Sequence, residues 1–119
     1  MELTVLAVPD CPNAAVLVER LAAALAGCPD AVVLRRQVAD EREAAETGMA
    51  GSPTLLINGT DPFAVPGQAP GLFCRFYRDA AGRLAGAPSV EDVRRALEQA
   101  RRGRPASGPQ PPGTAPALP

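Results

Sequence analysis

The feature that most constrains this fold is a Ser-Pro step at the head of an apolar strand. Residues 47–57 read Thr-Gly-Met-Ala-Gly-Ser-Pro-Thr-Leu-Leu-Ile, with Ser52-Pro53 directly before the apolar run. Proline has no N–H to donate to a strand ladder, so Pro53 must lie at the very start of the strand. Cis peptide bonds in proteins are nearly always X-Pro bonds, usually in tight turns. The sequence therefore predicts a cis bond between Ser52 and Pro53 and a strand over residues 54–57.

Hydrophobic periodicity predicts further strands and helices on both sides of this turn. An almost wholly apolar run at residues 3–8 predicts a strand buried on both faces, and residues 11–26 carry an apolar stripe at helical spacing. Asp10 or Asn13 can cap that helix. The other predicted elements are an edge strand over residues 32–38, a short helix opened by Asp40 and Glu43, a strand over residues 72–78 returning antiparallel after the hairpin signal Asn58-Gly59, and a helix capped by Ser89.

The length of 119 residues suits one domain, which we place at residues 1–102. Residues 103–119 are rich in Pro, Gly, Ala and Ser with almost nothing to bury, and we expect a disordered tail. A net charge of -1 predicts no nucleic-acid or anionic membrane partner. No run approaches the length of a membrane span, and the N-terminal run is too short for a signal peptide. The sequence by itself indicates no oligomeric state.

The composition limits the available chemistry to thiols and carboxylates. The chain contains neither His nor Lys nor Trp, which excludes imidazole catalysis, imidazole metal sites and Schiff-base chemistry. We accordingly expect no metal site and no cofactor. The three cysteines, Cys11, Cys28 and Cys74, form an odd and sparse set that argues against a secreted disulfide scaffold. A cytoplasmic, reducing location follows as an expectation.

The predicted order of elements is βαβ, a short helix and then ββα, and the Gly-Ser-Pro-Thr-Leu-Leu run resembles the cis-Pro segment of the thioredoxin family. This resemblance implies a thioredoxin-like α/β fold with a four-stranded mixed sheet and flanking helices. It also implies that the proline turn packs against a cysteine at the N-terminus of the first helix, here Cys11. Cys11-Pro12-Asn13-Ala14 is similar to the family's Cys-x-x-Cys with Ala14 in place of the second cysteine, and to the Cys-Pro-x-Ser of monothiol glutaredoxins.

The resemblance predicts a thiol-disulfide oxidoreductase in which Cys11 is the attacking thiol. Ser52, Pro53, Pro12 and Asn13 would contact the substrate, a thiol or disulfide of a protein or of a glutathione-like small molecule. Because Ala14 replaces the second cysteine, three alternatives stay open: Cys11 acts alone, Cys11 pairs with Cys74, or the chain is a non-catalytic binding module. Ser52 can equally be a simple turn former.

The other two cysteines are interpreted differently from Cys11. Cys74 stands at the centre of a predicted strand, where cysteine is often a small core residue, but arginines flank it at positions 75 and 78. We expect either a core residue or a second catalytic thiol there. Cys28 lies a helix length away from Cys11, and we interpret it as structural.

A second resemblance involves the segment Asp61-Pro62-Phe63 together with Cys74-Arg75-Phe76-Tyr77-Arg78. The two pieces are similar to small bacterial thioredoxin-like proteins, some of them labelled alkylmercury-lyase-like. Cleavage of a carbon–mercury bond needs soft thiolates on the metal and a proton donor for the carbon. In that alternative Cys11, Cys74 and Asp10 would supply these groups.

Overall fold

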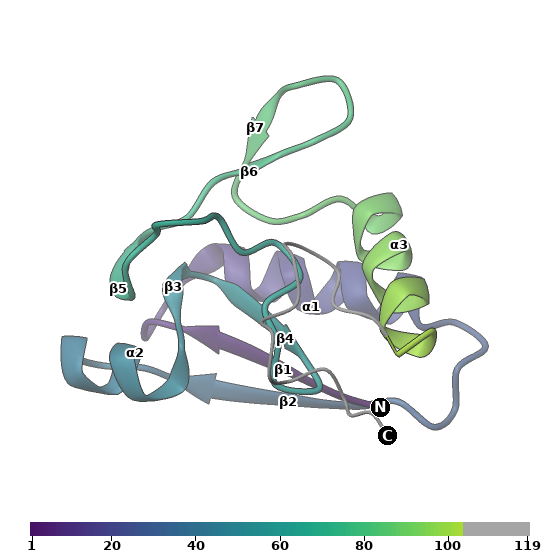
Figure 1. The fold of residues 1–119 in the computed structure, drawn as a ribbon, viewed down its shortest axis with the longest axis horizontal. Coiled ribbons are helices and arrows are strands. Elements are labelled where there is room, and N and C mark those ends of the chain that lie inside the picture. The colour runs from purple at the N-terminus through teal and green to yellow at the C-terminus, as the bar shows by residue number, and fades with distance from the viewer. Residues whose placement is uncertain (104–119) are drawn as a thin grey trace.

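A parallel β-α-β unit begins the chain, as the sequence predicts (Figure 1). Strand β1 (Glu2–Ala7) leads into helix α1 (Pro12–Ala24), and strand β2 (Val32–Gln37) lies parallel to β1. The remaining elements of this computed structural model are α2 (Glu41–Thr47), β3 (Ala50–Ser52), β4 (Thr54–Ile57), β5 (Gly71–Cys74), β6 (Tyr77–Arg78), β7 (Leu84–Ala85) and α3 (Val90–Arg101). Strand β4 runs antiparallel to β1 on its other side, so the main sheet has the order β2-β1-β4.

The structure describes residues 1–103. Apart from its first residue, the predicted tail at residues 103–119 lies outside the described residues. Within residues 1–103, no helix has the length and apolar character needed to cross a membrane. The longest helix, α1, has 13 residues.

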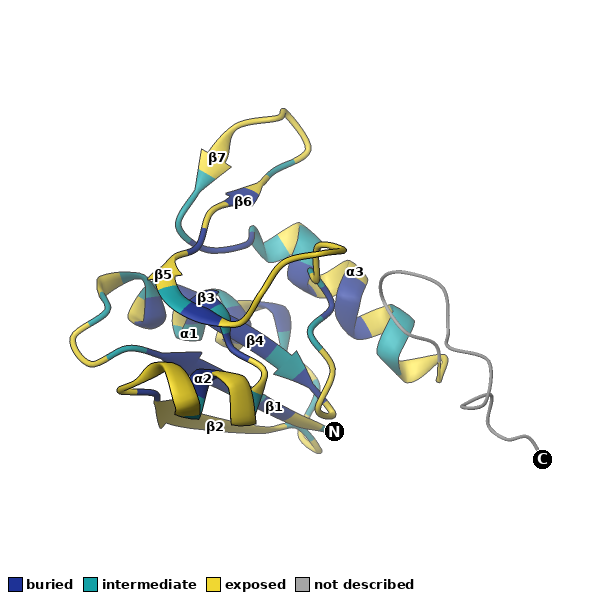
Figure 2. Cartoon of the chain, turned by 60° about the vertical axis from the view of Figure 1, so that its left-hand side comes forward, coloured by how far each residue is buried: buried dark blue, intermediate teal, exposed yellow. Residues whose placement is uncertain are grey.

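Strand β1 is buried on both faces because its apolar residues face helices on both sides (Figure 2). Alternate side chains of a strand point to opposite faces, so β1 contributes to two clusters. On one face the sheet meets α1 and α3, which pack against each other, and on the other face it meets α2. The first cluster includes Leu3, Val5, Leu17, Leu21, Leu55, Ile57, Val93 and Leu97, and the second is Leu6, Val38, Ala44 and Met49.

Two predicted helix caps are confirmed and one is wrong. The Asp40 carboxylate accepts a hydrogen bond from the Glu43 N–H at 2.8 Å, and the Ser89 hydroxyl accepts one from the Asp92 N–H at 3.1 Å. The N-cap of α1 is neither Asp10 nor Asn13 but Cys11, which makes no side-chain cap bond. The first turn of α1 therefore has no capping carboxylate or hydroxyl beside its N–H groups.

The predicted fourth strand does not join the main sheet. The Asn58-Gly59 turn forms, with Ile57 bridged to Thr60, but the return ends there because Asp61-Pro62 follows and Pro62 has no N–H to continue a ladder. The segment predicted as one strand over residues 72–78 is divided between β5, which pairs parallel with β3, and β6, which forms a hairpin with β7. The main sheet consequently has three strands rather than the expected four.

Candidate functional site

Cys11 lies between the end of β1 and the start of α1. Its N–H donates a hydrogen bond to the Val8 carbonyl at 3.3 Å, and its own carbonyl accepts one from the Ala14 N–H at 3.2 Å. The residue is half-buried, and α1 has no acidic side chain in its first turn. A helix N-terminus carries unpaired N–H groups and a partial positive charge, which together favour a thiolate. The position therefore suits a reactive sulfur.

The Ser52-Pro53 bond is cis, as predicted from the sequence, and it separates β3 from β4. Both residues are buried. The Ser52 hydroxyl accepts a hydrogen bond from the Val8 N–H at 3.0 Å. This bond joins the proline turn to the loop that leads into Cys11, although the two segments are 44 residues apart. The sequence predicted Ser52 as a substrate contact or a turn former, whereas the structure shows its side chain accepting a structural hydrogen bond.

Tyr77 lies beneath the same turn. Its hydroxyl donates a hydrogen bond to the Pro53 carbonyl, and its ring meets that of Phe63 edge to face at 5.6 Å between centroids. Burial raises the pKa of the Tyr77 phenol well above its usual value; the Asp61 and Cys11 charges add to the rise, and that of Arg75 opposes it. Tyr77 belongs to the segment of the second resemblance, but no role was predicted for it, and nothing in its local sequence indicates this contact.

A buried ion pair lies next to the Ser52-Pro53 turn and contacts Thr54, the residue that follows it. The Arg75 guanidinium lies 2.7 Å from an Asp61 carboxylate oxygen, and both side chains are largely buried. Arg75 also donates to the Thr54 hydroxyl at 3.2 Å and to the Phe63 carbonyl at 2.6 Å, and it lies 4.8 Å from the centre of the Tyr77 ring. A buried charge is tolerated when it is paired and its hydrogen bonds are satisfied, as they are here.

Cys74 is exposed, so the interpretation of this residue as a core side chain is wrong. The reason is that Arg75 and Tyr77 turn inward, which leaves the intervening Phe76 and the preceding Cys74 at the surface. The backbone of Cys74 is nevertheless paired with Ser52 across β3 and β5. It therefore lies beside the proline turn, and it is a free thiol like the other two cysteines.

Cys28 lies near the C-terminal end of α1, away from this turn. Its sulfur accepts a hydrogen bond from the Arg101 guanidinium at the end of α3. This contact joins the ends of the two helices and agrees with the structural role expected from the sequence.

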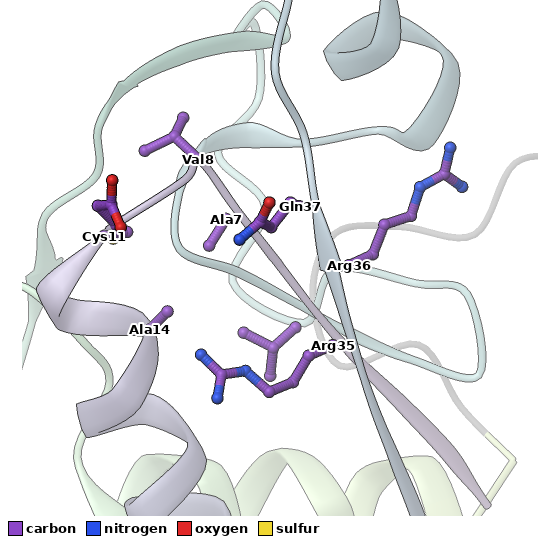
Figure 3. A pocket seen from close by; sticks show the side chains of 9 residues that line it. Ala7, Val8, Cys11, Ala14, Arg35, Arg36 and Gln37 are labelled. Atoms are coloured by element: carbon purple, nitrogen blue, oxygen red, sulfur yellow. The ribbon is translucent and has the colours of Figure 1, made fainter.

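A pocket of about 480 Å³ opens beside Cys11, between the start of α1 and strand β2 (Figure 3). The Arg35 side chain points toward the α1 side of this pocket, whereas Arg36 points away and pairs with Glu43 at 3.3 Å. The nine lining residues are Val5, Ala7, Val8, Asp10, Cys11, Ala14, Arg35, Arg36 and Gln37.

The other residues expected to contact a substrate do not line this pocket. Pro12 is exposed at the first position of α1. Ser52 and Pro53 form the buried turn that contacts the Val8 N–H, and they are not part of the pocket lining. The Asn13 side chain lies against Gly86, where it leaves no room for a Cβ atom. Asn13 therefore packs against the segment that leads into α3.

The described residues contain no group of three or more His, Cys, Asp or Glu side chains that could hold a metal ion. Asp10 and Cys11 line one pocket, but Cys74 is not part of it. The structure thus brings together two of the three groups named for carbon–mercury cleavage. The chain matches no protein-family model, no curated protein sequence and no solved structure.

Proposed function

We propose that this chain is a thioredoxin-like thiol-disulfide oxidoreductase that acts through Cys11. The observation that carries the proposal is the hydrogen bond from the Val8 N–H to the Ser52 hydroxyl at 3.0 Å. This bond holds the loop before Cys11 against the Ser52-Pro53 turn. A half-buried sulfur at a helix N-terminus is thereby joined to a buried turn whose backbone could bind an extended substrate. The arrangement supports thiolate chemistry in a reducing compartment.

The reaction proceeds by exchange of sulfur–sulfur bonds. The Cys11 thiolate attacks one sulfur of a substrate disulfide, forms a mixed disulfide with it and expels the other sulfur as a thiolate. A second thiol then attacks the Cys11 sulfur of this mixed disulfide and releases the remaining substrate thiol. The substrate gains two electrons, and two thiols are oxidised to a new disulfide.

The second thiol is either Cys74 or an external small-molecule thiol. If Cys74 acts, a Cys11–Cys74 disulfide forms, and an external dithiol must reduce it to complete the cycle. Exposure of Cys74 and its pairing with Ser52 support the first route. The absence of a cysteine at position 14 supports the second. Ser52→Ala or Cys74→Ser would not abolish mixed-disulfide formation at Cys11 in either route.

The pocket beside Cys11 supports a substrate that carries an acidic group. Arg35 is directed toward it and makes no ion pair with any residue of the described part of the chain. A guanidinium in that position binds a carboxylate well because its donors match carboxylate geometry. A glutathione-like thiol or an acidic protein segment next to a disulfide would meet this requirement.

Single-cysteine variants test the proposal directly. Each retains one of Cys11, Cys28 and Cys74, with the other two changed to Ser, and each is alkylated over a range of pH when folded and when unfolded in urea. We expect the folded Cys11 protein to react at neutral pH about tenfold faster than its unfolded form. It should also form a mixed disulfide with a small-molecule disulfide, detected by mass. If folding does not accelerate Cys11, the chain is a binding module that has kept the fold without the chemistry.

A further inference from the structure

Three of the four aromatic side chains of this chain line one groove at the N-terminal end of α3. The sequence has three Phe, one Tyr and no Trp, and Phe63, Phe76 and Tyr77 border the same cavity of about 420 Å³. Ligand sites typically have volumes of about 300–1,000 Å³. We call this cavity the aromatic groove; its other lining residues are Ala64, Val65, Arg75, Arg78, Leu84, Pro88 and Asp92.

The walls of the aromatic groove expose apolar side chains from three segments. Val65 belongs to the loop after β4, Phe76 precedes β6 and Leu84 begins β7. Within residues 1–103, these side chains are 58%, 65% and 60% exposed, respectively. Figure 1 shows the β6-β7 hairpin projecting from the rest of the molecule beyond the N-terminal end of α3. Single exposed apolar residues are common, but a group of them around one hollow is typical of a binding site.

Residues 109–112 have the composition that an aromatic groove binds. They read Pro-Gln-Pro-Pro, with prolines at the first, third and fourth positions. Such a sequence favours the polyproline II helix, which has three residues per turn, so Pro109 and Pro112 fall on one edge about 9 Å apart. Aromatic-lined grooves bind polyproline II segments along such an edge, and the preformed helix loses little entropy on binding.

The segment that precedes Pro109 is long enough to reach the aromatic groove. Asp92 lies in the first turn of α3 and lines the groove, whereas the described residues end at Gly103, just beyond the last turn. At a helical rise of about 1.5 Å per residue, Asp92 and Gly103 are roughly 16 Å apart along the axis. Gly103 has a φ of 74°, a left-handed conformation that ends the helix and turns the chain away from its axis. Residues 104–108 in extended form span about 15 Å, which brings Pro109 to the groove.

A segment that is joined to its binding site needs only a weak intrinsic affinity. Short flexible linkers give effective concentrations in the millimolar range. A dissociation constant as weak as about 0.1 mM would then keep the segment docked most of the time. The same segment of a second copy reaches this concentration only in a millimolar solution, which favours docking within one chain.

We propose that residues 109–112 of this chain dock in its own aromatic groove as a polyproline II segment, with Pro109 and Pro112 against Phe63 and Phe76. For these residues, docking replaces the disorder expected from composition. The aromatic groove and the Cys11 pocket have no lining residue in common. Docking requires no reactivity of Cys11, so the proposal goes beyond the proposed function and is tested independently of it.

Amide relaxation of the isotope-labelled full-length chain tests the docking. Proline has no backbone N–H, so Gln110 is the reporter within residues 109–112. An order parameter below about 0.6 marks a flexible amide. We expect Gln110 to lie above this value in wild type and below it in Pro109→Ala/Pro112→Ala, which leaves the groove unchanged. Pro105→Ala/Pro116→Ala is the matched control, because it removes two prolines outside the segment and should keep Gln110 ordered.

Phe76→Ser and Leu84→Ser test the same contact from the side of the groove. Both side chains are exposed within residues 1–103, so thermal melting should show an intact fold, and each substitution should lower the Gln110 order parameter below about 0.6. Val32→Ser is the control, because Val32 is 54% exposed on β2 and does not line the groove. A flexible Gln110 in wild type would overturn the proposal, as would an order parameter that the groove and control substitutions lower equally or not at all. Tenfold dilution should leave the order parameter unchanged; a decrease would assign the groove to the segment of a second copy and would also overturn the proposal.

Discussion

The Tyr77 hydroxyl donates its hydrogen bond to the carbonyl oxygen of Pro53, 24 residues earlier in the chain. The same turn receives the Val8 N–H on the Ser52 hydroxyl. The Ser52-Pro53 turn is therefore held from two directions, by the segment before Cys11 and by the segment after Cys74. Each contact joins the turn to a segment next to one of the two cysteines named in the proposed function, and each can be removed by its own substitution.

Tyr77→Phe keeps the ring and removes the hydroxyl. The Pro53 carbonyl then loses its partner in a buried position, which should lower the free energy of unfolding by about 1–3 kcal/mol. Urea denaturation measures this loss. Phe76→Leu is the matched control, because Phe76 is 65% exposed and should change stability little. Equal stability of wild type and Tyr77→Phe would contradict the role of this hydrogen bond.

The raised pKa of Tyr77 predicts a loss of stability in alkali. A phenol whose pKa is higher when folded binds its proton more tightly in the folded state. Its contribution is full below about pH 10, the usual value, and decreases as the pH rises above it. The chain has one tyrosine and no tryptophan, so the ultraviolet absorbance of tyrosinate reports Tyr77 alone. In the native protein, we expect the Tyr77 phenol to titrate only as the protein unfolds. In urea, it should titrate near pH 10. In Tyr77→Phe, this part of the alkaline destabilisation should be absent.

Asp61→Leu leaves the Arg75 guanidinium buried without its carboxylate and should lower the free energy of unfolding by about 3–5 kcal/mol. Arg75→Met leaves the Asp61 carboxylate buried without its guanidinium and should lower the free energy of unfolding by a similar amount. The double variant removes both charges and should be clearly more stable than the sum of the single losses predicts. Chemical denaturation of the four proteins measures this coupling. Additive losses would show that the two side chains do not act as a pair.

Ser52→Ala removes the acceptor of the Val8 N–H. We expect a loss of about 1 kcal/mol in stability, together with a changed alkylation rate of Cys11, because the loop before Cys11 is no longer held to the turn. Ser89→Ala is the matched control, since it removes a helix cap far along the chain at a similar cost of about 1 kcal/mol. A Cys11 rate that responds equally to both substitutions would reflect general destabilisation rather than this contact.

Arg35→Glu reverses the charge directed toward the Cys11 pocket. If the proposed function holds, mixed-disulfide formation with an anionic small-molecule disulfide should slow by about tenfold relative to a cationic one. Arg42→Glu, an exposed charge reversal on α2, should leave the ratio unchanged. The two rates can be measured by mass spectrometry on proteins that retain Cys11 as their single cysteine. An unaltered preference in Arg35→Glu would mean that Arg35 does not contact the substrate.

Local patterns predicted much of the framework. The apolar run of β1 and the interruption of β2 by polar residues predicted a buried strand and an edge strand, and both are confirmed. The caps at Asp40 and Ser89 and the cis bond before Pro53 were also predicted correctly. Each of these features depends on residues close together in sequence, where backbone sterics and hydrogen-bond donors leave few choices.

The tertiary structure decided what the segment after β4 does. Alternation alone could not tell which face of residues 72–78 turns inward, because both faces carry apolar side chains. The inward face is the one with Arg75 and Tyr77, since Asp61 and the Pro53 carbonyl provide the polar partners they need. Cys74 is therefore exposed, and its segment leaves the main sheet. The sequence by itself determined strands β1, β2 and β4, the caps at Asp40 and Ser89 and the proline turn. Only long-range pairing of buried polar groups determined how the turn is supported.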